Sequence, residues 1–232
     1  MALEKRFIIL IAPNVSEQKG GEGIKALQIF QHFRKIHSNT IQITHARNRA
    51  ELLAKPEIGN VIFVEDNALS VFLWKSYIFR WFIDTWFSYA AIAMAEKYVK
   101  MHCITGPVIL HQTEPNSPVV PRALSRKHIN VFGPINGNIY YPTIFKNRES
   151  FSTKIRRLTH FPLQLVNRFI PLGIKHADLI LSAGGSRTRD SLECAGCNPD
   201  IIKDSLDCGI EDKTLEQPRV IHDSKNLQFV HY

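Results

Sequence analysis

Three segments of the 232-residue sequence place glycine, proline and polar side chains at spacings that suit ligand binding. The first covers residues 19–23, reads Lys-Gly-Gly-Glu-Gly, and stands between an apolar run and a helical pattern. Glycine lets backbone N–H groups approach a ligand, and the start of a helix attracts phosphate. We therefore predict donor-phosphate binding by Gly20, Gly21, Glu22 and Gly23; a plain flexible turn is the alternative.

The second segment, residues 111–118, reads His-Gln-Thr-Glu-Pro-Asn-Ser-Pro and follows another apolar run. Its two prolines stiffen a loop that carries His111 and Glu114. Histidine can act there as an acid, a base or a hydrogen-bond donor. The alternative is a histidine that caps the strand and makes a structural hydrogen bond. We take His111 and Glu114 as candidate catalytic residues.

The third segment, residues 132–142, reads Phe-Gly-Pro-Ile-Asn-Gly-Asn-Ile-Tyr-Tyr-Pro. Gly133 and Gly137 permit unusual backbone angles, and asparagine supplies amide groups to an oxygen-rich ligand. We therefore add Asn136 to the candidate catalytic residues, and Gly137 and Asn138 to the donor-binding ones. A plain turn is again the alternative.

The elements that must position these segments alternate along the chain. Short apolar runs predict strands at residues 6–12, 40–44, 60–64, 107–111, 129–132 and 177–182. Helical patterns occupy residues 24–36, 49–53, 68–100, 150–176 (broken or kinked at Pro162 and Pro171) and 186–195. This alternation predicts an α/β fold, a Rossmann-like parallel sheet flanked by helices. The three segments, which follow the first, fourth and fifth strands, should then share one edge of the sheet.

The helical pattern at residues 68–100 is rich in aromatic side chains. Because apolar residues surround most of this predicted helix, we expect it to lie in the core. Lys75, Arg80 and Asp84 interrupt the pattern, so no uncharged span of about 18 residues exists and a membrane-spanning helix is not expected.

Positive charge concentrates in one region of a chain whose formal net charge is +8. Residues 143–176 contain seven lysines and arginines and a single glutamate. Such a region suits an anionic partner. Together with the three tryptophans at positions 74, 81 and 86, it also suits a peripheral membrane surface. We assign Arg156, Arg157 and Arg168 to an acceptor or membrane surface; a solvated face is the alternative. Nucleic acid is not an expected partner, because none of the predicted strands carries exposed aromatic residues alternating with basic ones.

The cysteines point to neither disulfides nor a metal. Cys194-Ala-Gly-Cys197 has zinc-like spacing, but no second pair accompanies it. The N-terminal residues do not resemble a signal peptide. We therefore expect a cytoplasmic protein, associated peripherally with the inner face of the membrane, that needs no metal or cofactor.

The order of these motifs resembles the N-terminal, acceptor-side domain of retaining glycosyltransferases of the GT-B fold, in the large family 4. Gly20 and Gly21 match the family's Gly-Gly loop after the first strand, and residues 111–118 match its His-x-x-x-Pro-type loop after the fourth. Residues 133–142 resemble a Gly-Pro-x-x-Gly-Gly loop followed by proline, with Asn138 in place of the last glycine. Many members have a histidine in the loop after the fifth strand, and in this sequence Gly133 occupies that neighbourhood instead.

The resemblance implies transfer of a sugar from a nucleoside diphosphate sugar to a glycan or lipid-linked saccharide, with retention and without a metal. It implies an acceptor-side domain at residues 1–210, a linker at 211–226, and the start of a nucleotide-sugar-binding domain at 227–232. We expect the chain by itself to be inactive or weakly active, because a transferase needs both halves to exclude water and align its substrates. A noncatalytic sugar- or nucleotide-binding remnant is the alternative.

Overall fold

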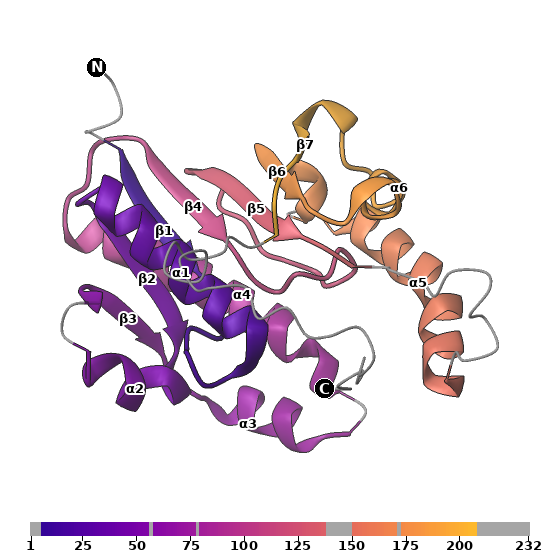
Figure 1. Ribbon diagram of the computed structural model, residues 1–232, viewed down its shortest axis with the longest axis horizontal. Helices are drawn as coiled ribbons and strands as arrows, with labels where there is room; N and C mark the ends of the chain where they lie inside the picture. Colours follow the sequence, from indigo (N-terminus) through magenta and orange to yellow (C-terminus); the bar gives the residue numbers. More distant parts are fainter. Residues whose placement is uncertain (1–5, 56–57, 78, 138–149, 171–172, 208–232) are drawn as a thin grey trace, which may run out of the picture.

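A computed structural model describes residues 6–55, 58–77, 79–137, 150–170 and 173–207 (Figure 1). Within these residues one parallel sheet has the strand order β3-β2-β1-β4-β5-β6-β7. Its strands are β1 (Phe7–Ile11), β2 (Thr40–His45), β3 (Val61–Val64), β4 (Val108–Gln112), β5 (Ile129–Ile135), β6 (Leu179–Ser182) and β7 (Ile202–Asp204). The predicted α/β class with a Rossmann-like parallel sheet is therefore confirmed.

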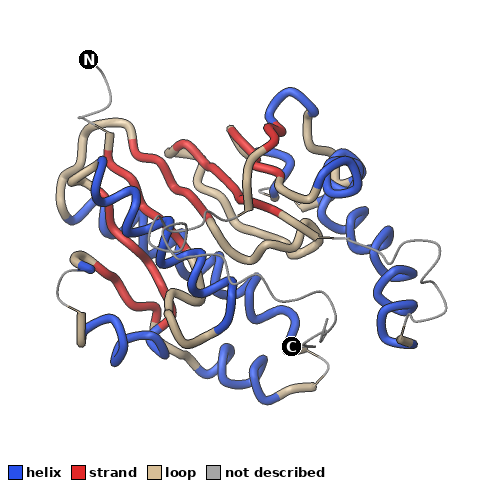
Figure 2. The backbone as a smooth tube through the Cα atoms, viewed as in Figure 1, coloured by secondary structure: helices blue, strands red, loops and turns tan. Residues whose placement is uncertain are grey.

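Helices cover both faces of the sheet, as Figure 2 shows. The α-helices are α1 (Gly20–Ile36), α2 (Arg49–Leu53), α3 (Ala68–Lys75), α4 (Ile83–Met101), α5 (Phe151–Phe169) and α6 (Gly185–Cys194). Single 3₁₀ turns are η1 (Ala46–Asn48), η3 (Arg80–Phe82), η5 (Ile174–His176) and η6 (Pro199–Ile201).

Alternate residues of β1 face opposite halves of the core. Ile8 and Leu10 are buried with Phe30 of α1, whereas Ile9 and Ile11 are buried with Phe87 of α4. This two-residue period, buried on both faces, explains why the first strand is an uninterrupted apolar run. A third buried cluster joins β5, β6 and α6.

Three differences from the predicted elements matter for function. The single helix predicted at residues 68–100 is instead α3, η3 and α4, because Ser76 is extended and ends α3. The strand predicted at 129–132 continues to Ile135, so Gly133 belongs to β5 and not to the loop after it. The break or kink expected at Pro162 does not end the helix, because α5 continues through this residue. The strand β7 was not predicted, because it has only three residues.

The expected burial of the aromatic residues between 72 and 89 is wrong for most of them. Phe87 is buried and Trp86 is partly buried, but the other seven are at least 40% exposed. These are Phe72, Trp74, Tyr77, Phe79, Trp81, Phe82 and Tyr89. Hydrophobic composition alone cannot separate a core helix from an exposed apolar surface, because both are rich in the same residues.

The order of the strands creates one preferred ligand position. From β1 the chain moves outward to β2 and β3, and then returns to place β4 on the other side of β1. Ligands of open α/β sheets bind at such a switch point, outside the carboxyl ends of the strands. Because β1, β4 and β5 are neighbouring parallel strands, the predicted shared edge of the three segments is confirmed. No described helix is long and apolar enough to cross a bilayer.

Candidate functional site

The connections that follow β1 and β4 meet at the switch point through Asn14 and Glu114. Glu114 is 2% exposed. Its Oε2 accepts hydrogen bonds from the Asn14 backbone N–H at 3.2 Å and from Asn14 Nδ2 at 3.4 Å. Its Oε1 has no hydrogen-bond partner among the described residues. A buried carboxyl oxygen without a partner is unusual and marks a position where a ligand group or water can bind.

The surroundings of Glu114 favour its neutral form. Burial, and secondarily the nearby charge of Glu22, raises the pKa of the Glu114 carboxyl to about 8. The carboxyl group is therefore mostly protonated at neutral pH. Because Oε2 already accepts two N–H bonds, the proton belongs on Oε1, which has no acceptor among the described residues.

The first turn of α1 is open beside this carboxyl. Gly20 and Gly21 are exposed, and a Cβ added to either would meet no atom within 4 Å. Lys19 precedes the helix without a side-chain cap; its Nζ donates instead to the Arg47 carbonyl at 2.9 Å and to Asn48 Oδ1 at 2.7 Å. First-turn N–H groups without a side-chain cap are donors that suit a phosphate.

Gly23 has a packing role that Gly20 and Gly21 do not share. It is buried, its carbonyl accepts from the Ser16 N–H at 3.2 Å, and an added Cβ would lie 3.2 Å from the Ser16 carbonyl oxygen. Gly23 therefore lets the connection after β1 pack closely against α1. It does not face a ligand as Gly20 and Gly21 can.

A buried lysine of α1 holds three of the connections at this edge together. Lys25 Nζ donates to Asn116 Oδ1 at 2.5 Å and to Asp207 Oδ1 at 2.9 Å. Asn116 Nδ2 donates in turn to Glu22 Oε1 at 3.0 Å, and Asn136 Nδ2 donates to Asp207 Oδ2. The network thereby joins α1 to the connections after β4, β5 and β7.

A second unpaired polar group lies on the connection after β4. Arg122 is fully buried, with its Nη2 donating to the Ser117 carbonyl at 3.3 Å and its Cζ 5.3 Å from the centre of the Phe132 ring. Among the described residues its Nε and Nη1 have no partner. Burial lowers the pKa of Arg122 to about 10, so the guanidinium stays charged at neutral pH.

His111 lies in the body of β4 and not on the loop after it. It is 6% exposed, its Nε2 lies 2.7 Å from the Gly133 carbonyl oxygen, and its ring meets the Phe33 ring edge-on at 6.0 Å. Burial lowers its pKa to about 4, so Nε2–H of a neutral imidazole donates to that carbonyl. This is the structural hydrogen bond that the sequence left open as the alternative, and it supports the irregular end of β5.

That irregular end depends on Gly133. Its φ is +114°, and the pairing of β5 with β6 shifts register between Phe132 and Ile135. A Cβ at Gly133 would lie 2.3 Å from the Leu181 carbonyl oxygen of β6. Only glycine fits this position, and the shift directs Asn136 toward Asp207 at the carboxyl edge.

A second strand–glycine–helix unit follows β6. Gly184 and Gly185 connect β6 to α6, and a Cβ at Gly185 would meet no atom within 4 Å. Thr188 Oγ1 donates to the Gly137 carbonyl at 2.8 Å, which ties α6 to the connection after β5. Two adjacent glycines between a strand and a helix are the signal that could have predicted this unit.

The predicted residues divide into three groups. The carboxyl edge gathers Gly20, Gly21, Glu22, Glu114, Asn136 and Gly137, while Gly23 and His111 pack behind it. Arg156, Arg157 and Arg168 lie on α5, of which Arg168 is exposed. Asn138 and the predicted linker and second-domain residues, 211–226 and 227–232, lie outside the described residues.

Compared with known proteins, the chain matches no family model and no curated relative. The chemistry of the site is therefore argued from its own geometry. Open first-turn N–H groups suit a phosphate, a protonated carboxyl suits a hydroxyl or phosphoryl oxygen, and side-chain amides suit a sugar. Together they suit a ligand that is both phosphorylated and rich in hydroxyl groups.

The described residues contain no group of three histidine, cysteine or acidic side chains that could hold a metal ion. Cys197 is buried, which raises the pKa of its thiol to about 12, and Cys194 is partly buried. The Cys197 thiol is therefore not activated as a nucleophile.

Proposed function

We propose that this chain is the acceptor-side domain of a GT-B-type glycosyltransferase. The reaction would move a sugar from a nucleoside diphosphate sugar to a hydroxyl of a glycan or lipid-linked saccharide, with retention of configuration. The observation that carries the proposal is the buried Glu114, with one unpaired oxygen, beside the open start of α1 at the switch point. The motif order of the sequence supports the same reaction class.

In this proposal the start of α1 binds the diphosphate. The N–H groups of the first turn and the positive end of the helix would stabilise the charge that develops on the diphosphate as the sugar–oxygen bond breaks. The exposed Gly20 and Gly21 leave the space above these donors free. Glu22 Oε1 accepts a hydrogen bond from Asn116 Nδ2, which directs this carboxylate toward the Lys25 network.

Glu114 is the proposed catalytic residue. Its Oε1–H would donate to a ligand oxygen whose negative charge increases in the transition state, so the bond would strengthen as the reaction proceeds. Overall the bond between the anomeric carbon and the diphosphate oxygen would break, a new bond between that carbon and the acceptor oxygen would form, and the acceptor proton would pass to the departing diphosphate. His111 and Asn136 would act as positioning residues, through Gly133 and Asp207 respectively.

Nucleotide binding by this chain tests the proposal. Isothermal titration calorimetry with UDP and GDP should detect binding of at least one nucleotide, and Gly21→Val should weaken it about tenfold or more. The valine side chain would occupy the open space above the first-turn N–H groups without disturbing packing. Binding is the readout because transfer is expected to need both halves of the enzyme, whereas the proposed diphosphate position at the start of α1 belongs to this chain.

His32→Val is the matched control, since His32 is an exposed residue farther along the same helix. It introduces the same side chain with almost no change in helix propensity and lies away from the first turn, so it should bind as the unchanged protein does. Equal binding by the Gly21→Val protein would reject the assigned phosphate position. Failure of both nucleotides to bind would reject the proposed function.

A further inference from the structure

Six aromatic side chains form an exposed apolar surface on α3 and η3. We call them the aromatic surface: Phe72, Trp74, Tyr77, Phe79, Trp81 and Phe82, each at least 40% exposed. The rings of Phe72 and Phe79 lie 6.0 Å apart, and those of Trp81 and Phe82 lie 4.9 Å apart. The surface is therefore built from ring–ring contacts. Large exposed apolar side chains gathered on neighbouring elements mark an interaction site.

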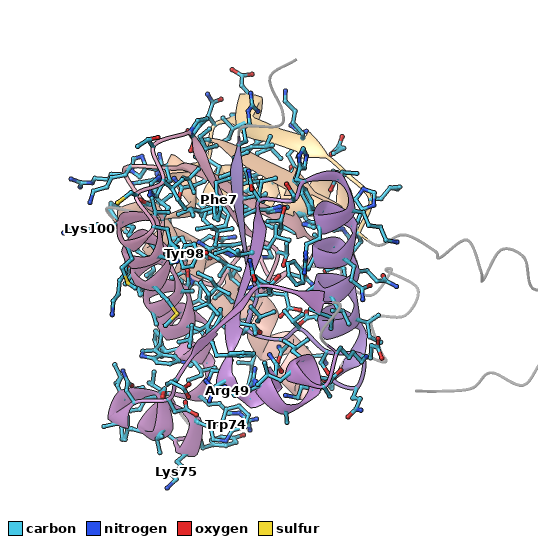
Figure 3. All side chains as sticks on the ribbon, turned by 90° about the vertical axis from the view of Figure 1, so that its left-hand side faces the viewer. Phe7, Arg49, Trp74, Lys75, Tyr98 and Lys100 are labelled. Carbon is cyan, nitrogen blue, oxygen red and sulfur yellow. The ribbon has the colours of Figure 1, made fainter. Side chains whose placement is uncertain are left out.

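The fold holds α3 in place while it leaves these rings outside. Asn67 and Ser70 cap the helix reciprocally, at 2.8 Å and 2.9 Å, and Ser70 Oγ also donates to Asp66 at 2.7 Å. Leu73 is buried and attaches the helix to the body. In Figures 1 and 3, α3 lies at one extremity of the molecule, and Lys75 points away from the body.

The charges around the aromatic surface are positive. Residues 68–83 contain Lys75 and Arg80 and no acidic residue. The Arg80 guanidinium lies 4.1 Å from the centre of the Trp74 ring, and the Arg47 guanidinium lies 5.9 Å from it. Tryptophan combined with arginine is the composition that favours the interface of a bilayer, where rings enter the acyl boundary and cations meet anionic headgroups.

We propose that the aromatic surface binds the surface of an anionic lipid bilayer. A second copy of the chain fits less well, because a symmetric contact would bring Lys75 and Arg80 against their own copies. The acidic residues nearest in sequence are Glu65 and Asp66, which pair with Arg49 and His45 respectively, and Asp84, which is partly buried. Among the described residues between 65 and 84, no exposed carboxylate is therefore left unpaired to meet Lys75 and Arg80 in such a dimer.

The aromatic surface is connected to the candidate site. Arg47, which covers one side of Trp74, also donates from Nη2 to Asn14 Oδ1 at 2.6 Å, and Asn14 donates to Glu114. The helix α3 begins directly after the carboxyl end of β3, on the same edge as the site. A bilayer bound by the rings would thus hold the site at the level of the headgroups. If the proposed function is correct, this arrangement favours a lipid-linked acceptor.

Vesicle binding tests this assignment. The protein should co-sediment with phosphatidylcholine vesicles that contain phosphatidylglycerol, and less with phosphatidylcholine alone. The chain has three tryptophans, at positions 74, 81 and 86, so its fluorescence should shift to the blue on binding. A Trp74→Ala, Trp81→Ala double variant should bind about tenfold more weakly or worse. Lys75→Glu with Arg80→Glu should abolish the preference for the anionic lipid.

The matched control replaces Ile36 and Met101 with alanine, since both are exposed apolar residues at the helix ends opposite the site. This control should bind as the unchanged protein does. Lack of vesicle binding, full binding by the tryptophan double variant, or loss of binding only in an α5 variant such as Leu158→Ala would overturn the proposal. So would a dimer in sedimentation equilibrium that the double variant dissociates. Vesicle binding by a protein that binds no nucleotide would support lipid binding by the aromatic surface and reject the proposed function. The failures of the two proposals are therefore distinguishable.

Discussion

Glu114→Gln should make the protein more stable above neutral pH, even though it alters the candidate catalytic residue. The folded pKa of about 8 exceeds the value of about 4.3 expected in the unfolded chain. Between these values the folded state binds more protons, so stability falls as the pH rises from about 4.5 to about 8. Glutamine keeps the hydrogen bonds of the neutral carboxyl and cannot ionise. At pH 8.5 we expect a gain of about 2 kcal/mol or more, which is about 4–8 °C in Tm.

Thermal unfolding at several pH values separates the effect of Glu114 ionisation from a change in stability that does not depend on pH. The difference between the Glu114→Gln protein and the unchanged protein should be close to zero near pH 4.5 and should grow to a plateau above pH 8. Glu193→Gln, on the exposed side of α6, should give no such dependence. A difference that is the same at pH 5 and pH 8.5, or a loss of stability at pH 8.5, would mean that Glu114 is ionised in the folded protein.

Gly133→Ala should be among the most damaging single-methyl additions in the chain. Besides the 2.3 Å contact with the Leu181 carbonyl, the added Cβ would lie 2.9 Å from the Ile135 nitrogen, and φ of +114° is unfavourable for alanine. Two of these obstacles are backbone atoms of β5 and β6, which cannot rotate away. We expect a loss of about 3 kcal/mol or more in the free energy of unfolding, measured by urea denaturation.

Gly21→Ala is the matched control, because a Cβ there meets no atom within 4 Å. It should leave the free energy of unfolding within about 0.5 kcal/mol of its original value or raise it slightly. If Gly133→Ala proved as harmless as this control, the register shift at the end of β5 would be wrong. Asn136 would then lose the position from which it donates to Asp207.

Much of the fold follows from local sequence patterns. Each strand of four or more residues was predicted within three residues at each end, because buried parallel strands are short apolar runs between glycine-rich or polar turns. The largest difference is at the end of β5, because Gly133 and Pro134 resemble a turn in the sequence. They extend the strand instead, because a positive φ at Gly133 accommodates an irregular pairing with β6.

The site was predicted less completely because its contacts are distant in sequence. Its glycines and Glu114 were recognised from their place after strands, but the Lys25–Asp207 ion pair joins residues 182 positions apart. No local pattern distinguishes Lys25 from any other helix lysine, and Asn14 and Arg122 were equally inconspicuous. His111 illustrates the reverse case: its residue type suggested chemistry, but its position inside β4 gave it a structural hydrogen bond.

Ligand-induced changes in amide NMR shifts test the central claim most directly, namely that a nucleoside diphosphate sugar binds over the β1–β4 switch point. UDP-glucose, UDP-N-acetylglucosamine and GDP-mannose would be titrated in turn into ¹⁵N-labelled protein. We expect the largest shifts for the bound sugar nucleotide to fall on residues 20–22, 114, 116, 136 and 137. Largest shifts at Thr40, Val61 and Ile129, where strands begin on the opposite edge, would contradict it.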